Sequence, residues 1–373
     1  MKDQKPHIAI LSPNRNAYSE TFIQAHKRLS DFRIFYYYGS PAYPEIEGKG
    51  PLLSGLGKIL AKALGILQQQ SPDNIGKKAL LRSWKKHQIK LILAEYGHTA
   101  AACIDAIATS GLPLIVHFHG YDATVKSLLE EYKTAYLKMF AYATYVIAVS
   151  RAMEKQLLAL GCPKEKLVNN VYGPNEFFFD VQPAFTQKRL ISIGRFTNKK
   201  APYYHVLAFE KVLRKHPDAR LVMAGDGYLK NTCTNLARFL KIEDKIDFCG
   251  IITPEQFREL LARSVALLQH SVVAENGDSE GTPLSVLEAG AAGLPVIGSR
   301  HAGIPDVVVH DQTGYVFEEH DVHTMAEQII DLLDDLEKAQ KMGENARVRI
   351  REKFSMDRHL NVLGNLISNA LSD

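Results

Sequence analysis

The stretch SVVAENGDSEGTPLSVLEAGAAGLPVIGSRHAGIPDV, residues 271–307, decides how the rest of the chain is interpreted. It predicts the end of a strand, an acidic loop with glycines, a short helix, a buried strand and a second loop. Thr282 is a suitable N-cap residue, and Pro283 stands where helices accept proline. Apolar residues recur at helical spacing from Leu284 onward, so we expect a helix from about Pro283 to Gly293.

A loop that leads into a helix N-terminus can bind an anion. The amides of the first turn have no acceptor within the helix, and the helix dipole places partial positive charge behind them. Here those amides lie in the segment 281–284, in which Gly281, Thr282 and Leu284 have an N–H and Pro283 does not. We therefore expect a phosphate or diphosphate group to bind at this segment.

Two carboxylates bracket the expected phosphate site. Glu280 precedes the helix, and Glu288 lies inside it among small and apolar residues. A buried acid needs hydrogen-bond donors, and a ribose with two adjacent hydroxyl groups can supply them. Two alternatives stay open: the pair could be the acid and nucleophile of a glycoside hydrolase, or a surface acid and a lysine-paired helix acid.

The motifs around these acids resemble a known family. Glu280 and Glu288 stand in an E-x7-E pattern, EGTPLSVLE, followed by AGAAGLPVIGS, GIPDVV and TGYVF. This series resembles the retaining GT-B glycosyltransferases of glycosyltransferase family 4. The strings NGD before EG and SRHAGIPD after it are most similar to bacterial exopolysaccharide and colanic-acid-type transferases. The resemblance implies two doubly wound Rossmann-like α/β domains facing a cleft, and sugar transfer from a nucleotide-diphosphate co-substrate without another cofactor or a metal.

Length and composition fit a two-domain globular protein. The chain has 373 residues, of which 46% are hydrophobic and 23% charged, so two domains are the natural expectation. We expect an acceptor-side domain over 1–175, a nucleotide-sugar donor domain over 183–355, and a closing helix over 356–373 that returns to the first domain. The four cysteines are scattered, which favours a reducing cytoplasm over a disulfide framework or a zinc site.

Charge is divided unevenly along the chain. Residues 1–180 carry 22 lysines and arginines against 15 acidic residues. Such a basic half could meet an anionic membrane or a phosphorylated acceptor, whereas no arginine-rich arm or aromatic pattern indicates nucleic acid. An apolar stripe between Leu52 and Leu67 is typical of a helix packed on its own sheet. The alternative is a helix at the inner face of a membrane, helped by the nearby cations Lys77, Lys78, Arg82, Lys85 and Lys86.

The first half is predicted to consist of repeated strand and helix units. Continuous apolar runs at residues 7–11, 33–38, 89–94, 113–117 and 144–149 indicate strands buried on both faces, which is typical of a parallel, doubly wound sheet. We expect helices from about Glu20, from about Ala123 to Ala141, and up to Leu160. Ser19 and Glu20 follow the first strand, where they could contact an acceptor or simply cap a helix. No apolar run is long enough for a secretion signal or a membrane span.

A histidine motif, HFHGYD at residues 117–122, ends one of the strands. Ligands bind at the carboxyl ends of strands in open α/β sheets. The string resembles the family's histidine motif, which implies that His119 faces the donor sugar and that His117 is structural. Asp122 is a further candidate on the acceptor side. Several relatives have a histidine where this chain has Glu95, so the resemblance supports no acceptor role there.

The second half opens with two cations after a strand. Arg195 and Lys200 lie in GRFTNKK, and their pattern resembles the family's diphosphate clamp, although Ala201 stands where a glycine is usual. A planar guanidinium and a point charge suit phosphate oxygens. Gly250 and Ile251 end a later strand where relatives hold the base. No G-x-G-x-x-G with a following acid supports a dinucleotide oxidoreductase.

Together these observations predict a retaining glycosyltransferase that acts on a glycan or lipid-linked glycan acceptor in cell-surface polysaccharide synthesis, with UDP or GDP as the nucleotide. A sugar-nucleotide epimerase of the same fold and a non-catalytic nucleotide-sugar-binding assembly protein are the alternatives. The candidate catalytic residues are His119, Arg195, Lys200 and Glu280. The candidate donor-binding residues are Gly250, Ile251, Gly281, Thr282, Pro283, Leu284 and Glu288.

Overall fold

The computed structural model describes residues 5–15, 21–53 and 72–372, together with residues 55, 59 and 63. Its contacts divide the chain into two compact units. Unit 1 comprises 1–149, 153–170 and 360–373, and unit 2 comprises 150–152 and 171–359. The last helix, α15 (Met356–Ser372), begins in unit 2 and belongs to unit 1 from Leu360 onward.

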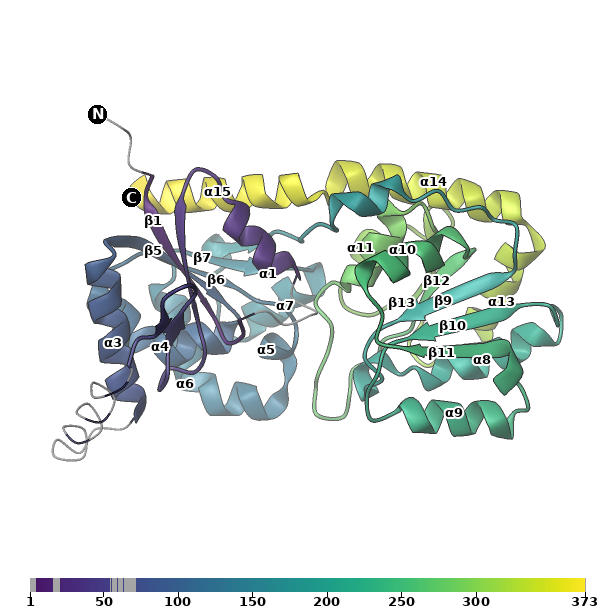
Figure 1. Cartoon of the computed structure of the whole chain (residues 1–373), viewed down its shortest axis with the longest axis horizontal. Helices are drawn as coiled ribbons and strands as arrows, with labels where there is room; N and C mark the ends of the chain where they lie inside the picture. Colours follow the sequence, from purple (N-terminus) through teal and green to yellow (C-terminus); the bar gives the residue numbers. More distant parts are fainter. Residues whose placement is uncertain are drawn as a thin grey trace. The chain divides into compact units, whose positions relative to one another are not determined.

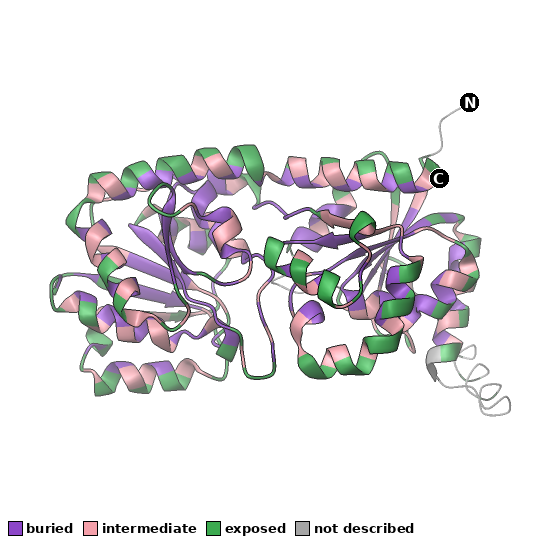
Figure 2. Ribbon diagram, turned by 180° about the vertical axis from the view of Figure 1, so that it is seen from behind, coloured by how far each residue is buried: buried purple, intermediate pink, exposed green. Residues whose placement is uncertain are grey.

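Unit 1 is built on a mainly parallel sheet. Among the described residues its strand order is β4-β3-β2-β1-β5-β6-β7-β8, and only the short edge strands β3 and β4 pair antiparallel. The strands are β1 (His7–Ser12), β2 (Arg33–Tyr38), β3 (Glu45–Ile46), β4 (Gly50–Pro51), β5 (Ile89–Glu95), β6 (Leu114–His117), β7 (Tyr145–Ala148) and β8 (Leu167–Asn169). The central strands are almost wholly buried, and Figure 2 shows them in purple.

The helices of unit 1 connect successive parallel strands, as the apolar runs of the sequence predict. They are α1 (Thr21–Ala25), α3 (Pro72–Lys86), α4 (Gly97–Ser110), α5 (Tyr121–Thr124), α6 (Lys126–Tyr142) and α7 (Arg151–Ala159). The helix predicted from about Ala123 to Ala141 is found as α6, which begins three residues later, at Lys126. Val125 adopts an extended backbone conformation, with φ −67° and ψ 116°, which separates α5 from α6.

Unit 2 is a doubly wound domain with an entirely parallel sheet in the order β11-β10-β9-β12-β13-β14 across the described residues. Its strands are β9 (Arg189–Ile193), β10 (Arg220–Ala224), β11 (Ile246–Gly250), β12 (Ala266–Gln269), β13 (Val296–Ser299) and β14 (Gly314–Phe317). Its helices are α8 (Tyr203–Leu213), α9 (Lys230–Phe239), α10 (Pro254–Ala262), α11 (Leu284–Ala291), α12 (Ile304–Val307), α13 (Val322–Asp334) and α14 (Leu336–Lys353). Figure 1 shows helices on both faces of this sheet.

The strand order places one topological switch point in each unit. In unit 1 the chain leaves β1 for β2 and later returns to pair β5 on the other edge of β1. In unit 2 the same reversal occurs at β9, which lies between β10 and β12. Ligands of open α/β sheets bind at the carboxyl ends of the strands at such points. The fold therefore favours ligand binding at the loops that follow β1 and β5 in unit 1 and β9 and β12 in unit 2.

Two sequence predictions fall on residues outside the described ranges. Ser19 and Glu20 are among them, and so is most of the apolar stripe between Leu52 and Leu67. The acceptor-side and membrane hypotheses that rest on these residues remain predictions. Within the part of the chain that the structure describes, no helix combines the length and the apolar composition that crossing a membrane requires.

Candidate active site

An ion pair joins the two switch-point loops of unit 2. Lys200 ends the short 3-10 turn Asn198–Lys200 after β9, and Glu280 lies in the loop after β12. Lys200 Nζ lies 3.2 Å from Glu280 Oε1, and the two side chains are only 15% and 11% exposed. The cation and the acid that sequence reasoning picked out independently are thus in contact at the carboxyl edge of the sheet.

The charges of this pair stabilise each other in a site with little water. Burial raises the pKa of Glu280, but Lys200 and Lys199 outweigh burial and lower it to about 2. Burial lowers the pKa of Lys200, and Glu280 partly reverses that shift. Glu280 Oε1 has no hydrogen-bond partner among the described residues despite its closeness to Lys200. An ionised oxygen with spare acceptor capacity is suited to a hydroxyl group of a ligand.

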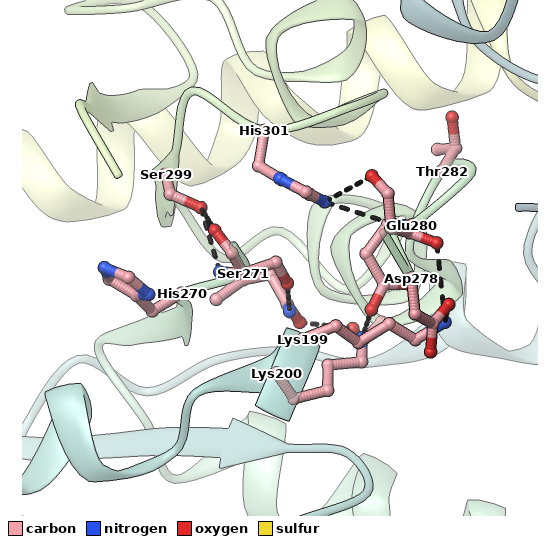
Figure 3. A network of polar contacts seen from close by, with 12 residues as sticks. Lys199, Lys200, His270, Ser271, Asp278, Glu280, Thr282, Ser299 and His301 are labelled. Atoms are coloured by element: carbon pink, nitrogen blue, oxygen red, sulfur yellow. Dashed lines mark hydrogen bonds and ion pairs between the residues drawn. The ribbon is translucent and has the colours of Figure 1, made fainter. Parts of the chain in front are cut away.

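A second set of contacts holds the loop that carries Glu280. Lys199 Nζ donates to Asp278 Oδ1 at 2.9 Å, and Nε2 of His301 accepts from the Glu280 amide at 3.2 Å. Nδ1 of His301 lies 2.6 Å from Glu319, a carboxylate that can only accept, so Nδ1 carries the hydrogen and Nε2 is free to accept. Figure 3 shows Lys199 and Lys200 reaching towards Asp278 and Glu280, with His301 on the other side of the loop. Sequence reasoning missed this support, although His301 stands within the SRHAGIPD string.

Arg195 and Lys200 line one hollow at the carboxyl end of β9, together with residues from α8, β10 and β12. The Arg195 side chain is exposed and makes no hydrogen bond or ion pair with the described residues. Lys200, in contrast, is fixed by Glu280. One guanidinium with open donors and one fixed point charge at the same strand end suit phosphate oxygens.

The helix after the acidic loop starts one residue later than predicted, and Thr282 is not its cap. The N-cap of α11 is Pro283, whose ψ of 122° ends the extended segment, and no side chain caps the helix. Thr282 is buried, and its carbonyl accepts a hydrogen bond from the Tyr172 hydroxyl. The amides of Gly281 and Leu284 donate to no described residue, so they remain candidates for phosphate binding.

Glu288 lies on α11 with no hydrogen-bond partner among the described residues. Burial raises the pKa of its carboxyl to about 8. The nearby Tyr172 has its pKa raised by burial and further by both Glu280 and Glu288, which places the two acids around one tyrosine. A partly buried acid without donors fits the prediction that a ribose supplies them, and that assignment remains a prediction.

The raised pKa of Glu288 makes the stability of the free protein depend on pH. The carboxyl titrates near 4.5 when unfolded and near 8 when folded, so folding favours its protonated form. The carboxyl of Glu288 makes its full contribution to the free energy of unfolding below about pH 4.5. This contribution is lost as the pH rises through about 8. We expect Glu288→Gln to raise the melting temperature at pH 9 by roughly 2–4 °C, the shift that about 1 kcal/mol produces in a domain of this size. An equal rise in the melting temperature of Glu288→Gln at about pH 5 would contradict this dependence on pH.

Ala201, directly after Lys200, adopts the left-handed conformation with φ +39° and ψ 51°. That conformation costs an L-residue with a Cβ roughly 1–2 kcal/mol, whereas glycine adopts it freely. We expect Ala201→Gly to stabilise the protein by about 0.5–1 kcal/mol in urea unfolding, since the loss of a buried methyl group offsets part of the gain. Ala208 is equally buried but lies within α8. Ala208→Gly is therefore the matched control and should destabilise by about 1 kcal/mol.

The strand end predicted to hold the base is exposed. Gly250 ends β11 with φ +71°, and its carbonyl accepts from the Gly225 amide at 2.6 Å. Ile251 follows with 71% of its surface exposed. An apolar side chain presented to solvent at the carboxyl edge of a sheet is available for a flat ligand group. Its role in binding the base stays a prediction.

Unit 1 brings together a polar cluster that sequence reasoning did not foresee. Glu95 ends β5, is fully buried, and places Oε1 at 2.7 Å from His26 Nδ1. Its Oε2 lies 2.8 Å from Nε2 of His119 and 3.5 Å from Nδ1 of His117. Burial lowers the pKa of His117 to about 3, which agrees with the structural role that the resemblance implies for this residue.

Asp122, proposed as an acceptor-side residue, has its carboxylate occupied by the backbone. Its Oδ1 accepts from the amides of His119 at 3.0 Å and Gly120 at 2.9 Å, and its Oδ2 accepts from the Gly97 amide at 2.8 Å. The side chain is fully buried. These contacts indicate that Asp122 fixes the loop that carries His119 rather than reaching an acceptor itself.

Among the described residues, one set of side chains has the spacing of metal ligands. The donor atoms of His26, Glu95 and His117 all lie within 4.8 Å of one another. Two imidazoles and a carboxylate are a common ligand set for a transition metal. The same residues are also linked to each other by short polar contacts. The spacing alone therefore fits both a metal site and a network of hydrogen bonds.

Two family models match this chain. The model for glycosyl transferases group 1 matches residues 175–349, and the model for Glycosyltransferase Family 4 matches residues 40–168. Between them the two models cover most of the chain, and they support a glycosyltransferase of the family 4 type. The family resemblance predicted from EGTPLSVLE and its neighbouring motifs is therefore confirmed.

Curated relatives of this family 4 chain align over part of their length. The amylovoran biosynthesis glycosyltransferase AmsK of Erwinia amylovora is 29% identical over 241 residues, which make up 64% of this chain and 59% of AmsK. N-acetyl-alpha-D-glucosaminyl L-malate synthase of Bacillus anthracis is 38% identical over 173 residues, 46% of this chain and 43% of that protein. The chain thus spans about three fifths of AmsK and less of the synthase.

Solved structures match the family 4 chain over nearly its whole length. Anabaena HepE in complex with UDP and glucose has a TM-score of 0.77 at 16% identity, covering 98% of this chain and 100% of HepE. Sucrose-phosphate synthase from Thermosynechococcus elongatus has a TM-score of 0.78 at 18% identity, covering 99% of this chain and 100% of the synthase. These likenesses, with the two parallel sheets, confirm the predicted GT-B fold of two Rossmann-like domains.

Proposed function

We propose that this chain transfers a sugar from a nucleotide-diphosphate sugar to a hydroxyl group of a glycan or lipid-linked glycan, with retention of anomeric configuration. The bond between the sugar's anomeric carbon and the diphosphate oxygen breaks, and a bond from that carbon to the acceptor oxygen forms. The acceptor hydroxyl loses its proton, and the nucleoside diphosphate leaves with the bonding electron pair and takes up that proton. No redox partner is needed.

The observation that carries this proposal is the meeting of Lys200 with Glu280 at the switch point of unit 2, beside Arg195 on the same hollow. The barrier to transfer lies in expelling the diphosphate from a sugar that gains positive charge. Arg195, Lys200 and the amides of Gly281 and Leu284 would stabilise negative charge growing on the leaving group, which requires no proton transfer. Because these groups can neutralise the diphosphate, we also propose that no metal ion is required.

The remaining candidates receive roles that agree with their surroundings. Glu280, ionised and with a spare acceptor oxygen, would bind hydroxyl groups of the transferred sugar. Glu288 would bind the ribose, and Ile251 would contact the base. In unit 1, His119 would contact a hydroxyl group of a sugar.

The proposals for the acceptor class and for the donor are based on the names of relatives. AmsK is named for amylovoran biosynthesis, WcaL of Escherichia coli for putative colanic acid biosynthesis, and HepE was solved with UDP and glucose. We therefore propose a polysaccharide acceptor and place UDP-hexoses first among the donors to be tested.

The test is a donor screen followed by product analysis. Thermal shift against UDP, GDP and other nucleoside diphosphates identifies the base, because a ligand of the folded state raises the melting temperature. The matching nucleotide sugar is then incubated with and without a glycan acceptor, with and without EDTA. We expect an acceptor-dependent product with the donor's anomeric configuration in NMR, unchanged by EDTA. A modified free sugar from the donor alone would instead indicate an epimerase, and tight binding without turnover would indicate an assembly protein.

A membrane location is a separate proposal that rests on α3. This helix carries five cations, of which Lys78, Arg82, Lys85 and Lys86 are exposed. At low ionic strength each such residue near an anionic surface contributes about 1 kcal/mol. We expect the protein to float with vesicles of anionic lipid and to remain behind when Lys85 and Lys86 are replaced by glutamate. Absence of flotation at low salt would refute the proposal, and zwitterionic vesicles are the control.

A further inference from the structure

Glu95 determines which ring nitrogen of His119 carries a hydrogen. Burial raises the pKa of Glu95, but His26, His117 and His119 outweigh burial and hold it well below its usual value. An ionised carboxylate only accepts hydrogen bonds. Because Glu95 Oε2 lies 2.8 Å from Nε2 of His119, Nε2 must be the donor. The neutral ring of His119 therefore has an unprotonated Nδ1.

Nδ1 of His119 lacks a hydrogen-bond partner in the part of the chain that the structure describes. The atom is buried. A buried acceptor that is left unsatisfied costs about 1–3 kcal/mol. His119 follows β6 at the carboxyl edge of the sheet, where ligands of this fold class bind. No donor from the described residues faces this atom, and a ligand bound at this strand end is a candidate to supply one.

The surroundings of His119 fix both its backbone and its ring. Its amide donates to Asp122 at 3.0 Å, and its ring packs 4.9 Å from the ring of Phe22 and 4.6 Å, edge on, from the ring of Tyr96. Tyr96 follows Glu95 with φ +67°, a conformation that a residue with a side chain adopts at a cost. Strained backbone of this kind is typical of positions where one orientation of a side chain is required.

We propose that Glu95 is a positioning residue, which holds His119 with Nε2 protonated so that Nδ1 accepts a hydrogen bond from a hydroxyl group of a bound sugar. This inference rests on the proposed function for the identity of the ligand. The orientation of the His119 ring does not depend on that function.

The cluster around Glu95 could instead be a packing device or a metal site, and each alternative has its own consequence. If Glu95 only fills space and satisfies its neighbours, an apolar side chain of similar size should leave the chemistry of His119 unchanged. If His26, Glu95 and His117 hold a transition metal, the protein should contain that metal as purified, and a chelator should remove it. If Glu95 bound a metal, its oxygens would be shared between the metal and His119.

The test compares Glu95→Leu, Glu95→Gln and His26→Gln with the wild-type chain. Multiple-bond 1H–15N NMR of the imidazoles, assigned with His119→Gln, reports which nitrogen of each ring is protonated. We expect Nε2 protonation in the wild type, retention in Glu95→Gln, whose amide oxygen still accepts, and a mixture of tautomers in Glu95→Leu. His26→Gln disturbs the other oxygen of Glu95 and should leave the His119 signals unchanged.

The kinetic arm measures sugar transfer with the donor identified by the thermal-shift screen. Loss of an orienting partner typically costs about 10- to 100-fold, and we expect that loss in kcat/KM for Glu95→Leu, with most of it recovered in Glu95→Gln. Affinity for the nucleoside diphosphate alone should not change, because Glu95 lies in unit 1 and the candidate nucleotide site in unit 2. Circular dichroism checks that each variant folds.

The outcomes separate this inference from the proposed function. If the wild type transfers no sugar, the function fails, and the NMR arm alone decides the role of Glu95. A wild-type ring protonated on Nδ1 would overturn the inference without any variant, even if Glu95→Leu does not fold. Equal activity of the leucine and glutamine variants would also overturn it, and so would a stoichiometric metal in metal analysis of the purified protein.

Discussion

Replacing Lys200 with alanine is expected to lower turnover by about two to three powers of ten, the usual loss when one preorganised group that stabilises a developing anion is removed. The ammonium is fixed 3.2 Å from Glu280 and lines the hollow it shares with Arg195. Its charge would therefore meet the leaving diphosphate without a cost of reorganisation. The effect should fall on kcat more than on KM, since the charge it stabilises is largest in the transition state.

The experiment must separate catalysis from folding. Removing one partner of a buried pair leaves the remaining charge uncompensated, which typically costs about 3–5 kcal/mol. Lys199 offers a matched control: it is the adjacent cation, it is buried, and it pairs with Asp278 at 2.9 Å, but it does not line the hollow of Arg195. Lys199→Ala should destabilise the loop comparably and lose far less turnover than Lys200→Ala.

Kinetics at a temperature where both variants are folded, as judged by circular dichroism, distinguish the two effects. Lys200→Met adds a third comparison, because it keeps the apolar stem and removes only the charge. Equal losses in Lys199→Ala and Lys200→Ala would show that the loop's integrity, and not a charge on the leaving group, is what Lys200 contributes. Turnover in Lys200→Met within about tenfold of the wild type would lead to the same conclusion, because loss of a true anion-stabilising group costs more.

The sequence predicts the layers of this fold better than it predicts the contacts at the site. Strands such as β5 and β6 are buried on both faces, so their apolar runs are continuous and identify a parallel sheet without reference to tertiary structure. Strand order is different, because no local pattern says that β12 pairs with β9 rather than with β11. The switch point that brings residues 200 and 280 together follows only from that order.

Polar partners distant in sequence are the part that local reasoning misses. Glu95 meets His26 across 69 positions and His119 across 24, and nothing in either neighbourhood signals the other. The prediction that Thr282 caps α11 failed for a local reason. Thr282 has the right side chain, but Pro283 takes the cap position in an extended conformation, and the Thr282 carbonyl is held by Tyr172. Residue propensity located the start of this helix to within one residue. It did not reveal that the hydroxyl of a distant residue, Tyr172, donates to the Thr282 carbonyl.

Replacing Glu288 with alanine is expected to weaken binding of nucleoside diphosphates by about 10- to 100-fold, because a hydrogen bond to a charged group contributes roughly 1.5–3 kcal/mol. In the free protein burial raises the pKa of this carboxyl to about 8, and ribose hydroxyl groups are donors that favour the ionised form. Binding should therefore strengthen as pH rises from 6 to 9. Calorimetry of the wild type and of Glu288→Gln across that range measures the effect, and the glutamine variant should lack this dependence.

A change of ligand makes the assignment of Glu288 specific. A 2′-deoxynucleoside diphosphate lacks one of the two hydroxyl groups that the carboxylate would accept from, so the wild type should bind it more weakly than the ribonucleotide. In Glu288→Ala that difference should disappear, because the carboxylate that accepts from the hydroxyl group is gone. The change in the protein and the 2′-deoxy change in the ligand together form a double-mutant cycle. If the alanine variant still discriminates between the ribo and deoxy forms as the wild type does, Glu288 does not bind the ribose. The raised pKa would then reflect only a carboxyl buried beside Tyr172.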